Sequence, residues 1–562
     1  MSRSERWTWI ALVALALILR LAALNVTPLA PDEALAALPA LAASRGEGWP
    51  LSAESPLLLV GNALLFTLFG GGTGAARLLP ALVGSALVAL PLLWRKQLGA
   101  TGALAGGALL ALSPTPLFAS RRLDPAVVGA AGAALILTAL FTGEEREHPL
   151  LFTFVAGAGT LLGLLGGPNF YDLLLPGLAA WFAYRWMSEK APRAPSSLLR
   201  GLSGGAVAAL LVSVGFGLRW NGWSGPADGF AAWLGSWSAG GAVEIAQLLL
   251  YEPLSLLLAL VGLILAVKRS SSLALSLALW GLLGSLLLML RSGASPPALI
   301  APVLPLILLA GWSAQHLLAG SAEWQWLGIK LHVPLSLVFW LFAGLALTRQ
   351  TTHHRTGMEA VLLVLVLAIQ GLITAAFATL ADLPTARRGL LLGLAAALLL
   401  VQLAFGVSLA YVRSTEPTEP LVETAASHDL YNLRRLLKDL RRVENLSPER
   451  MEVWLVAGTP EVTAVTAWAL HDLPGLRIVE TWPEEAADLV ITPADYAPSG
   501  IDDAFVGLPV VALVRSGGPV PGCKTHIPLD CHYPLAWYLY RTSPVPYVQE
   551  RVILWKNQTL QP

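Results

Sequence analysis

The amino-acid sequence predicts a polytopic α-helical membrane protein with about thirteen transmembrane helices and a C-terminal α/β domain outside the cytoplasm. Of its 562 residues, 55% are hydrophobic and only 13% are charged, and the mean hydropathy is +0.65. This is more apolar surface than one soluble core can bury. Apolar runs of spanning length stop near residue 412, which divides the chain into a transmembrane module (1–412) and a soluble domain (413–562). The formal net charge is zero, so no overall attraction to nucleic acid is expected.

The predicted spans are apolar runs that approach the length of about 20 residues needed to cross about 30 Å of hydrocarbon. They are 7–25, 76–94, 101–119, 125–141, 149–166, 171–187, 201–218, 252–267, 272–290, 297–316, 333–347, 358–379 and 388–412. No clear small-residue cleavage site follows the first run, so we interpret it as a span and not as a cleaved signal peptide.

Basic residues gather in alternate loops between the predicted spans, and alternate loops lie on the same side of the membrane. This pattern predicts the orientation of the chain. They are Arg3, Arg6, Arg95, Lys96, Arg185, Lys190, Arg193, Arg200, Lys268, Arg269, Arg387 and Arg388. Because cytoplasmic loops are enriched in Lys and Arg, the N-terminus is predicted to be cytoplasmic. An odd number of spans then places the C-terminal domain outside, and we expect a multi-pass protein of the plasma or inner membrane.

A further apolar run, 56–70, has only fifteen residues and is short for a crossing. Counting it as a span would invert every later loop and place Arg95 and Lys96 outside. We therefore predict an interfacial helix at 56–70 within a first external loop of residues 26–75.

The C-terminal domain alternates helix-like and strand-like segments, which predicts a small α/β domain. The strand-like segments are 452–457, 477–481, 488–493 and 509–514, with a helix expected near 460–472. Cys523 and Cys531 both lie in this domain. An external location favours a disulfide between them, whereas their spacing alone is equally consistent with two free thiols.

Charged residues collect where the predicted spans meet the outer aqueous phase. They are Asp32, Glu33, Glu54, Arg121, Arg122, Asp124 and Arg291. An acidic pair after Pro31 is also typical of an ordinary helix start, and single arginines are common interface anchors. A set with both charges has a chemical use, because guanidinium groups bind phosphate and a carboxylate can take a proton from an attacking hydroxyl.

Several segments of about the first 315 residues follow one another in a recognisable order. They are Arg20 within the first span, Asp32–Glu33, Glu54-Ser55-Pro56-Leu57, LFG (68–70), AARLLPALVGSAL (75–87), LLALSPTPLFASRRLD (109–124), LLLYEPLSLLLALVGLILAVKR (248–269), and Arg291 before Pro296, Pro297, Pro302 and Pro305. This order resembles that of the GT-C membrane glycosyltransferases, in particular the protein O-mannosyltransferase and lipid A aminoarabinose transferase type. Beyond these segments only the general plan, more spans and then an external domain, is similar.

The resemblance implies an inverting glycosyltransferase that moves a sugar from a polyprenyl-phosphate-linked donor to a protein, lipid or glycan acceptor on the extracytoplasmic face. It implies that Asp32 is the base toward the acceptor, that Glu33 is its structural neighbour, and that Asp124 is a second acidic residue of the same cavity. The implied contacts to the donor phosphate are Arg121, Arg122 and Arg291.

The same resemblance gives Glu54 the position of an acidic residue that contributes to a metal site in the aminoarabinose transferases, so a divalent metal ion is a candidate cofactor. The sequence departs from the family at Ser55, where many relatives have a basic residue or His, and at 166–172, where relatives often have lysine-glycine. His353 and His354 form a predicted external pair, but such loop pairs are more often solvated than metal-bound.

Two other functions compete with the transferase. A transporter or lipid flippase would also be polytopic, but no half-to-half repeat is evident and the charges cluster at one interface. A non-catalytic subunit of a glycan-assembly complex would keep the fold and differ only in the integrity of the site at Asp32 and Asp124. The tryptophans before the eighth predicted span fit either an interfacial aromatic belt or a surface on which a sugar stacks. They are Trp220, Trp223, Trp233 and Trp237.

Overall fold

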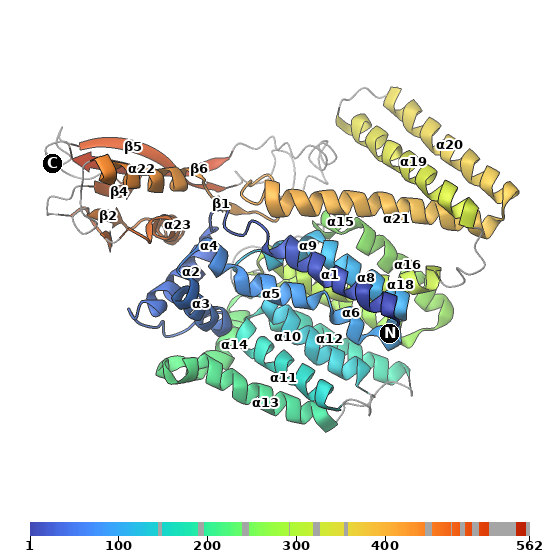
Figure 1. The fold of residues 1–562 in the computed structure, drawn as a ribbon, viewed down its shortest axis with the longest axis horizontal. Coiled ribbons are helices and arrows are strands. Elements are labelled where there is room, and N and C mark those ends of the chain that lie inside the picture. The colour runs from blue at the N-terminus through green and yellow to red at the C-terminus, as the bar shows by residue number, and fades with distance from the viewer. Residues whose placement is uncertain are drawn as a thin grey trace.

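A bundle of long helices forms most of the molecule, and a mixed β-sheet lies beyond one end of it (Figure 1). The computed structural model describes the chain except for residues 144–148, 189–195, 239–244, 246, 292, 319–325, 353–357, 444–451, 474, 484–488, 497–504, 516–546 and 558–562. The predicted Cys523–Cys531 pair and the His353–His354 pair lie outside the described residues.

The principal helices of the bundle follow the predicted spans. They are α1 (Arg3–Leu21), α5 (Leu78–Leu87), α6 (Leu90–Leu93), α8 (Ala100–Leu112), α9 (Pro114–Ser120), α10 (Ala126–Thr142), α11 (Pro149–Gly166), α12 (Asn169–Met187), α13 (Ser196–Ser213), α16 (Pro253–Arg269), α17 (Ser272–Leu290), α18 (Ile300–Leu318), α19 (Trp326–Thr352), α20 (Met358–Leu380) and α21 (Leu383–Val407). By length and hydropathy, five helices in the described part of the chain can cross a membrane, or six if the bent pair α8–α9 is one span. Each predicted run overlaps a helix, but the count of about thirteen spans stays a prediction.

Helix α10 is buried along nearly all of its length and leads directly out of the charged segment 121–124. Glycines let it approach its neighbour α11 closely: a Cβ on Gly132 would lie 2.3 Å from the backbone nitrogen of Gly163, and one on Gly166 would lie 2.8 Å from that of Gly129. Small residues at helix contacts are typical of membrane bundles. The packing fixes the position of the N-terminus of α10, where Asp124 lies.

The predicted span 101–119 is bent by 56° between α8 and α9. Ser113 and Pro114 stand at the bend, and Pro is well suited to the first position of a new helix. The buried carboxylate of Glu252 accepts hydrogen bonds from the Ser113 hydroxyl and from the backbone N–H of Thr115 (3.1 Å). The bend therefore has a defined cause, and it directs α9 toward the segment that carries Arg121 and Arg122.

The first loop holds two helices, α2 (Pro31–Ser44) and α3 (Pro56–Phe69), which pack against each other. At about 1.5 Å per residue, a 14-residue helix such as α3 is about 21 Å long and shorter than the hydrocarbon layer. The Ser55 hydroxyl accepts from the backbone N–H of Leu58 (3.4 Å) and donates to the carbonyl of Leu165 (2.9 Å). Ser55 therefore caps α3 and ties it to α11. The interfacial position of 56–70 stays a prediction.

The C-terminal sheet contains six strands in the order β1-β5-β6-β4-β2-β3 among the described residues. Their bounds are β1 (Thr424–Ala426), β2 (Val453–Val456), β3 (Leu476–Val479), β4 (Leu489–Pro493), β5 (Phe505–Arg515) and β6 (Val548–Asn557). Strands β3, β2 and β4 are parallel, and β6, β5 and β1 continue the sheet antiparallel. Helices α22 (Asp429–Val443) and α23 (Pro460–Leu470) complete the α/β arrangement.

The sheet domain contacts the first loop through α23. The indole of Trp468 donates to the hydroxyl of Thr73 (3.4 Å) and its ring lies 5.9 Å from that of Phe66. The guanidinium of Arg45, just past the end of α2, donates to the carbonyl of His471 (2.8 Å). The far end of α2 is therefore attached to the C-terminal domain.

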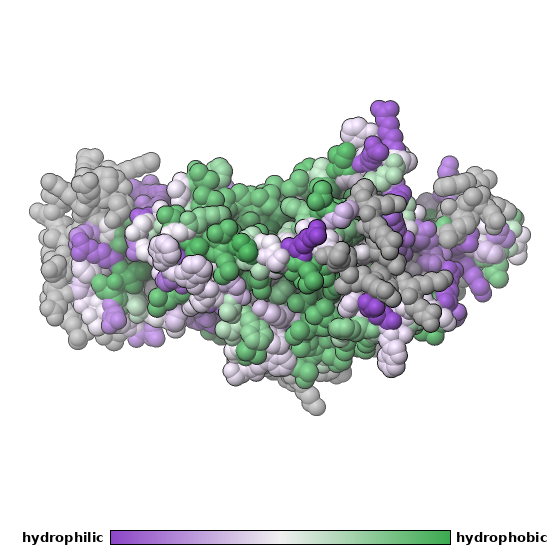
Figure 2. All heavy atoms as spheres, turned by 90° about the horizontal axis from the view of Figure 1, so that it is seen from below, coloured by the Kyte–Doolittle hydropathy of each residue, from purple (hydrophilic) through white to green (hydrophobic). Residues whose placement is uncertain are grey.

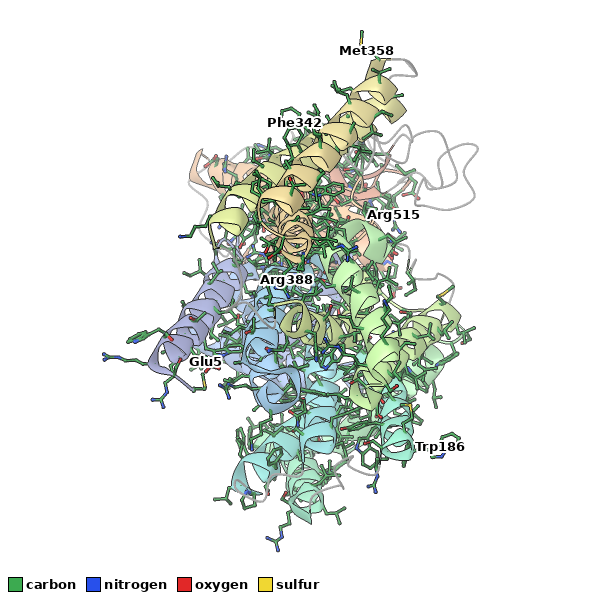
Figure 3. All side chains as sticks on the ribbon, turned by 90° about the vertical axis from the view of Figure 1, so that its right-hand side faces the viewer. Glu5, Trp186, Phe342, Met358, Arg388 and Arg515 are labelled. Carbon is green, nitrogen blue, oxygen red and sulfur yellow. The ribbon has the colours of Figure 1, made fainter. Side chains whose placement is uncertain are left out.

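The N-terminus and the C-terminal domain lie at opposite ends of the bundle, and apolar surface covers the middle (Figures 1 and 2). Arg95 pairs with Glu5 through two hydrogen bonds (2.6 and 2.9 Å), so this basic loop lies beside the N-terminus. Helices α19 and α20 project from the rest, with Phe342 (54% exposed) and Met358 (81% exposed) on their outer surface (Figure 3). Exposed apolar side chains of this kind are expected where lipid is the solvent.

We expect the two ends to lie on opposite sides of the membrane. With Cys523 and Cys531 replaced by Ser, the variant Glu47→Cys should react with a membrane-impermeant thiol reagent in intact cells, because the positive-inside rule places α2 outside. The matched variant Lys268→Cys should react only after lysis. Reversed labelling of the two positions would contradict the predicted orientation.

Candidate active site

Asp32 and Arg122 meet at the end of the bundle where α2 begins beside the loop after α9. One guanidinium nitrogen of Arg122 (Nη2) donates to both carboxylate oxygens of Asp32, at 2.9 and 3.0 Å. The Asp32 side chain is 53% exposed, whereas that of Arg122 is 12% exposed. The predicted base is thus held by a partly buried cation and is still open to an incoming molecule.

Glu33 points inward and is fully engaged. Its carboxylate accepts from two nitrogens of Arg77 (2.8 and 2.6 Å) and from the backbone N–H groups of Leu123 (2.7 Å) and Ala30 (2.9 Å). Burial alone would raise the pKa of Glu33, but Arg77 and the other donors lower it to about 2. Glu33 therefore holds the start of α2 against the segment 121–124.

Arg77 was not identified as a site residue from the sequence, although it lies in the segment 75–87 that carries the family resemblance. Besides Glu33, its guanidinium donates to the carbonyls of Leu24 (3.1 Å), Thr27 (3.1 Å) and Pro28 (2.9 Å). These bonds fix the chain between α1 and α2. A buried arginine with six acceptor atoms, including the Thr27 hydroxyl, organises the backbone on which Asp32 is placed.

Asp124 is buried and accepts a hydrogen bond from the backbone N–H of Ala126 (2.7 Å), the first residue of α10. Burial raises the pKa of Asp124 to about 7, with further contributions from the charges of Asp32 and Glu54. Glu54 has exposed surface but is surrounded by protein on most sides. The pKa of Glu54 is raised, mainly by this desolvation. The positive charge of Arg291 opposes the increase, and the negative charge of Asp32 adds to it. Three carboxylates, Asp32, Glu54 and Asp124, therefore share one electrostatic environment.

The predicted phosphate-binding arginines have different surroundings. Burial lowers the pKa of Arg122, but the charges of Asp32, Glu33 and Asp124 outweigh it and raise that pKa, so Arg122 remains charged. Arg121 instead turns toward α1: its Nη1 donates to the carbonyls of three residues there, and its guanidinium lies 4.1 Å from the ring of Tyr411. Arg291 is buried and pairs with Asp172. The structure brings Arg122 and Arg291 to the carboxylates and gives Arg121 mostly structural contacts.

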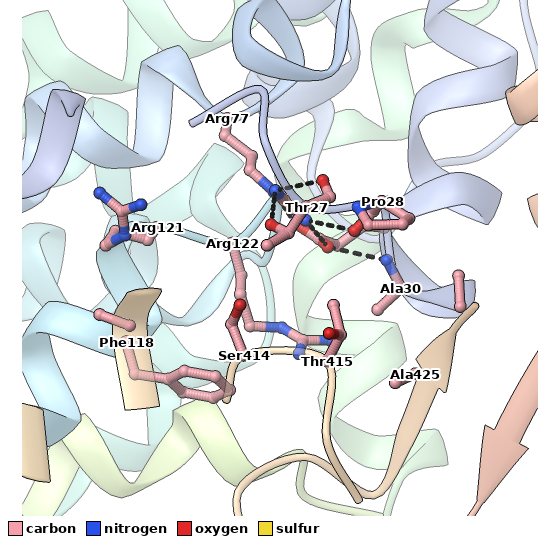
Figure 4. Close-up of a pocket in the computed structure, with 13 residues that line it drawn as sticks. Thr27, Pro28, Ala30, Arg77, Phe118, Arg121, Arg122, Ser414, Thr415 and Ala425 are labelled. Atoms are coloured by element: carbon pink, nitrogen blue, oxygen red, sulfur yellow. Dashed lines mark hydrogen bonds and ion pairs between the residues drawn. The ribbon is translucent and has the colours of Figure 1, made fainter. Parts of the chain in front are cut away.

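A small polar cavity lies beneath this cluster, between the first loop, α9 and the start of the C-terminal domain (Figure 4). Its lining includes Glu33, Arg77, Arg122, Ser414 and Thr415. The volume of about 30 Å³ has room for water, which needs roughly 10–15 Å³, and is too small for a sugar. A donor molecule would therefore have to lie on the open side of Asp32.

The part of the chain that the structure describes contains no group of three or more His, Cys, Asp or Glu residues that could hold a metal ion. Glu54 in particular lacks a described set of partner ligands that would complete such a site.

No family model and no curated protein matches the sequence. Among solved structures, the fold is similar to that of ArnT from Cupriavidus metallidurans in the apo state, with a TM-score of 0.53, 16% identity and 100% of both chains covered. The chain has the fold of ArnT. The structure of the same ArnT bound to undecaprenyl phosphate is also similar, with a TM-score of 0.51 and 16% identity over 86% of this chain and 93% of that one. The GT-C resemblance expected from the order of sequence segments is confirmed at the level of the fold.

The raised pKa of Asp124 predicts how the stability of the protein depends on pH. Because the pKa is 3.8 in a free side chain and about 7 in the folded protein, the folded protein binds a proton that the unfolded chain releases between these values. Folding stability should therefore fall as the pH rises through this window. Asp124→Asn keeps the acceptor for Ala126 and removes the titration. Its thermal midpoint relative to wild type should be higher at pH 8 than at pH 5.

Thermal unfolding in detergent at the two pH values measures this difference. The control is Glu47→Gln, which removes an exposed carboxylate of the same loop and should leave the pH dependence as it is in wild type. An Asp124→Asn variant whose stability follows the wild-type pH dependence would show that Asp124 does not titrate in this range.

Proposed function

We propose that this protein is an inverting glycosyltransferase that moves a sugar from a polyprenyl-phosphate donor to an acceptor hydroxyl at the outer face of the membrane. The observation that carries the proposal is the accessible carboxylate of Asp32, held by Arg122 at one end of a GT-C bundle. An exposed carboxylate beside buried guanidiniums combines a proton acceptor with groups that stabilise a phosphate.

In the proposed reaction, Asp32 takes the proton of the acceptor hydroxyl while the oxygen attacks the anomeric carbon of the donor sugar. The bond from that carbon to the phosphate oxygen breaks, and its electron pair stays on the polyprenyl phosphate that leaves. Arg122 and Arg291 offset the negative charge that develops there. The attack from the face opposite the phosphate inverts the anomeric configuration.

The fold supports the choice of donor. ArnT, an aminoarabinose transferase with the same fold, has been solved with undecaprenyl phosphate bound. A lipid phosphate in this chain would lie with its head group at the level of Asp32 and Arg122 and its isoprenoid chain along the apolar bundle. The acceptor, whether protein, lipid or glycan, is not determined by these residues.

The proposal is tested with the purified protein and a panel of sugar-labelled polyprenyl phosphates. Wild-type protein should release polyprenyl phosphate and pass the label to an acceptor fraction of its own cell envelope. A deletion strain should lack the corresponding glycan. Absence of both effects would favour the non-catalytic subunit, and movement of the lipid across proteoliposomes without sugar transfer would favour the flippase.

A further inference from the structure

The predicted phosphate ligand Arg291 is held by a carboxylate that the sequence did not mark as functional. Nη2 of Arg291 donates to Oδ2 of Asp172 at 2.7 Å, and the two side chains are 2% and 0% exposed. Asp172 lies in the first turn of α12, within the segment 166–172 where the sequence departs from its relatives. A fully buried pair is therefore built at the position of this departure.

Helix α14 (Gly225–Gly235) holds both partners of the pair. The indole N–H of Trp233 donates to the other oxygen of Asp172 at 3.0 Å. The hydroxyl of Ser236, directly after α14, accepts from Nη1 of Arg291 at 3.0 Å, and the carbonyl of the same serine accepts from the backbone N–H of Gly293 at 2.8 Å. The orientation of the guanidinium is thus fixed from two sides.

The same helix also contacts the segment that carries Glu54. Asp228 accepts from the backbone N–H of Ala53 at 3.3 Å. Gly229 lies against Gly167, because a Cβ on Gly229 would be 3.2 Å from the Cα of Gly167. The charge of Arg291 also acts on Glu54. Helix α14 therefore connects the Arg291–Asp172 pair with the segment that carries Glu54.

Among the described residues, Nη1 and Nη2 of Arg291 each donate one hydrogen bond, to Ser236 and to Asp172. A guanidinium has five N–H groups, and Nε of Arg291 is buried without a partner in the described residues. An unsatisfied buried donor costs stability, and a buried ion pair is weak evidence for stability in itself. The buried Arg291–Asp172 pair and the unpaired Nε donor are better explained by a ligand oxygen that accepts from Arg291 than by packing alone.

We propose that Asp172 is a positioning residue that holds Arg291 in the orientation in which its guanidinium binds the donor phosphate. This inference rests on the proposed function for the identity of the ligand, a phosphate monoester or diester on a lipid. Asp172 acts only through Arg291 and does not touch the substrate itself. Trp233 and Ser236 support the same geometry from α14.

The test measures binding of undecaprenyl phosphate to the full-length protein, for example by native mass spectrometry, so that it does not depend on turnover. Asp172→Asn should weaken binding by about tenfold or more, as loss of a hydrogen-bonded charge typically does. Asp172→Glu, which restores the charge, should recover part of the affinity. In an Arg291→Ala background, Asp172→Asn should have no further effect, because its partner is already missing.

Two further variants keep the test decisive. Trp233→Phe removes a single hydrogen bond to Asp172 and should weaken binding by a few-fold even if Asp172→Asn does not fold. Glu5→Gln breaks an ion pair at the opposite end of the bundle and should leave binding unchanged. Wild-type affinity in folded Asp172→Asn, or additive losses in the double variant, would overturn the inference. If the variants changed binding of undecaprenyl phosphate as expected but the protein transferred no sugar, the proposed function would be contradicted and this inference would stand.

Discussion

Replacing Asp32 with Asn is expected to reduce sugar transfer by roughly 10²–10⁴-fold, the usual loss when a positioned base is removed. Asn has the same shape as Asp, and its side-chain oxygen can still accept a hydrogen bond from Arg122, but it cannot take the proton of an acceptor hydroxyl. The protein should therefore remain folded and inserted and should still bind undecaprenyl phosphate. Initial rates of transfer and lipid affinity, measured on the same preparation, separate these effects.

The matched control for this variant is Glu47→Gln, an exposed acidic residue beyond the other end of α2. Its transfer rate should equal that of wild type. If Asp32→Asn retained near wild-type transfer while Glu47→Gln behaved normally, Asp32 would not be the base. A reduced rate together with lost lipid binding would indicate a disturbed fold at the site.

The largest expected effect on stability belongs to Arg77→Ala. This change leaves the buried carboxylate of Glu33 without its cation, and breaking a buried pair in this way typically costs roughly 3–5 kcal/mol. It also removes the donor to the carbonyls of Leu24, Thr27 and Pro28. The thermal midpoint should fall far below that of wild type, and transfer should be lost because Asp32 is no longer held in place.

A comparison at the other end of the bundle checks this explanation. Arg95→Ala breaks a pair with Glu5 that is partly exposed, so its effect on the thermal midpoint should be small. Arg77→Met combined with Glu33→Gln should recover part of the stability, since no uncompensated charge then remains buried. Equal destabilisation by Arg77→Ala and Arg95→Ala would show that burial of the pair is not the cause.

The helices were predictable because apolar runs of spanning length depend only on local composition. The bend between α8 and α9 could not be predicted in this way. It is stabilised by Glu252, which lies more than 130 residues away in the chain. Among the strands, β1 and β6 were missed. Strand β1 has only three residues, and the partners of both strands, β5 for β1 and β4 and β5 for β6, are distant in sequence.

The residues of the candidate site also divide into those that local sequence marks and those whose partners are distant in sequence. Asp32, Glu54, Asp124 and Arg122 were predicted as site residues because charges at the ends of apolar runs are conspicuous in the sequence. Arg77 and Asp172 are also charged, but they stand within predicted apolar spans, where they are less conspicuous. Their importance depends on the partners Glu33 and Arg291, which only the fold brings near.

The attachment of α2 at both ends has a mechanical consequence. Its first turn carries Asp32 and is joined through Glu33 to the segment 121–124, whereas Arg45 at its far end is bonded to the C-terminal domain. A helix of 14 residues, about 21 Å long, transmits displacement along its axis with little deformation. The C-terminal domain and the Asp32 carboxylate are therefore connected by one helix, and we expect a molecule that tilts this domain to change the reach of Asp32 as well.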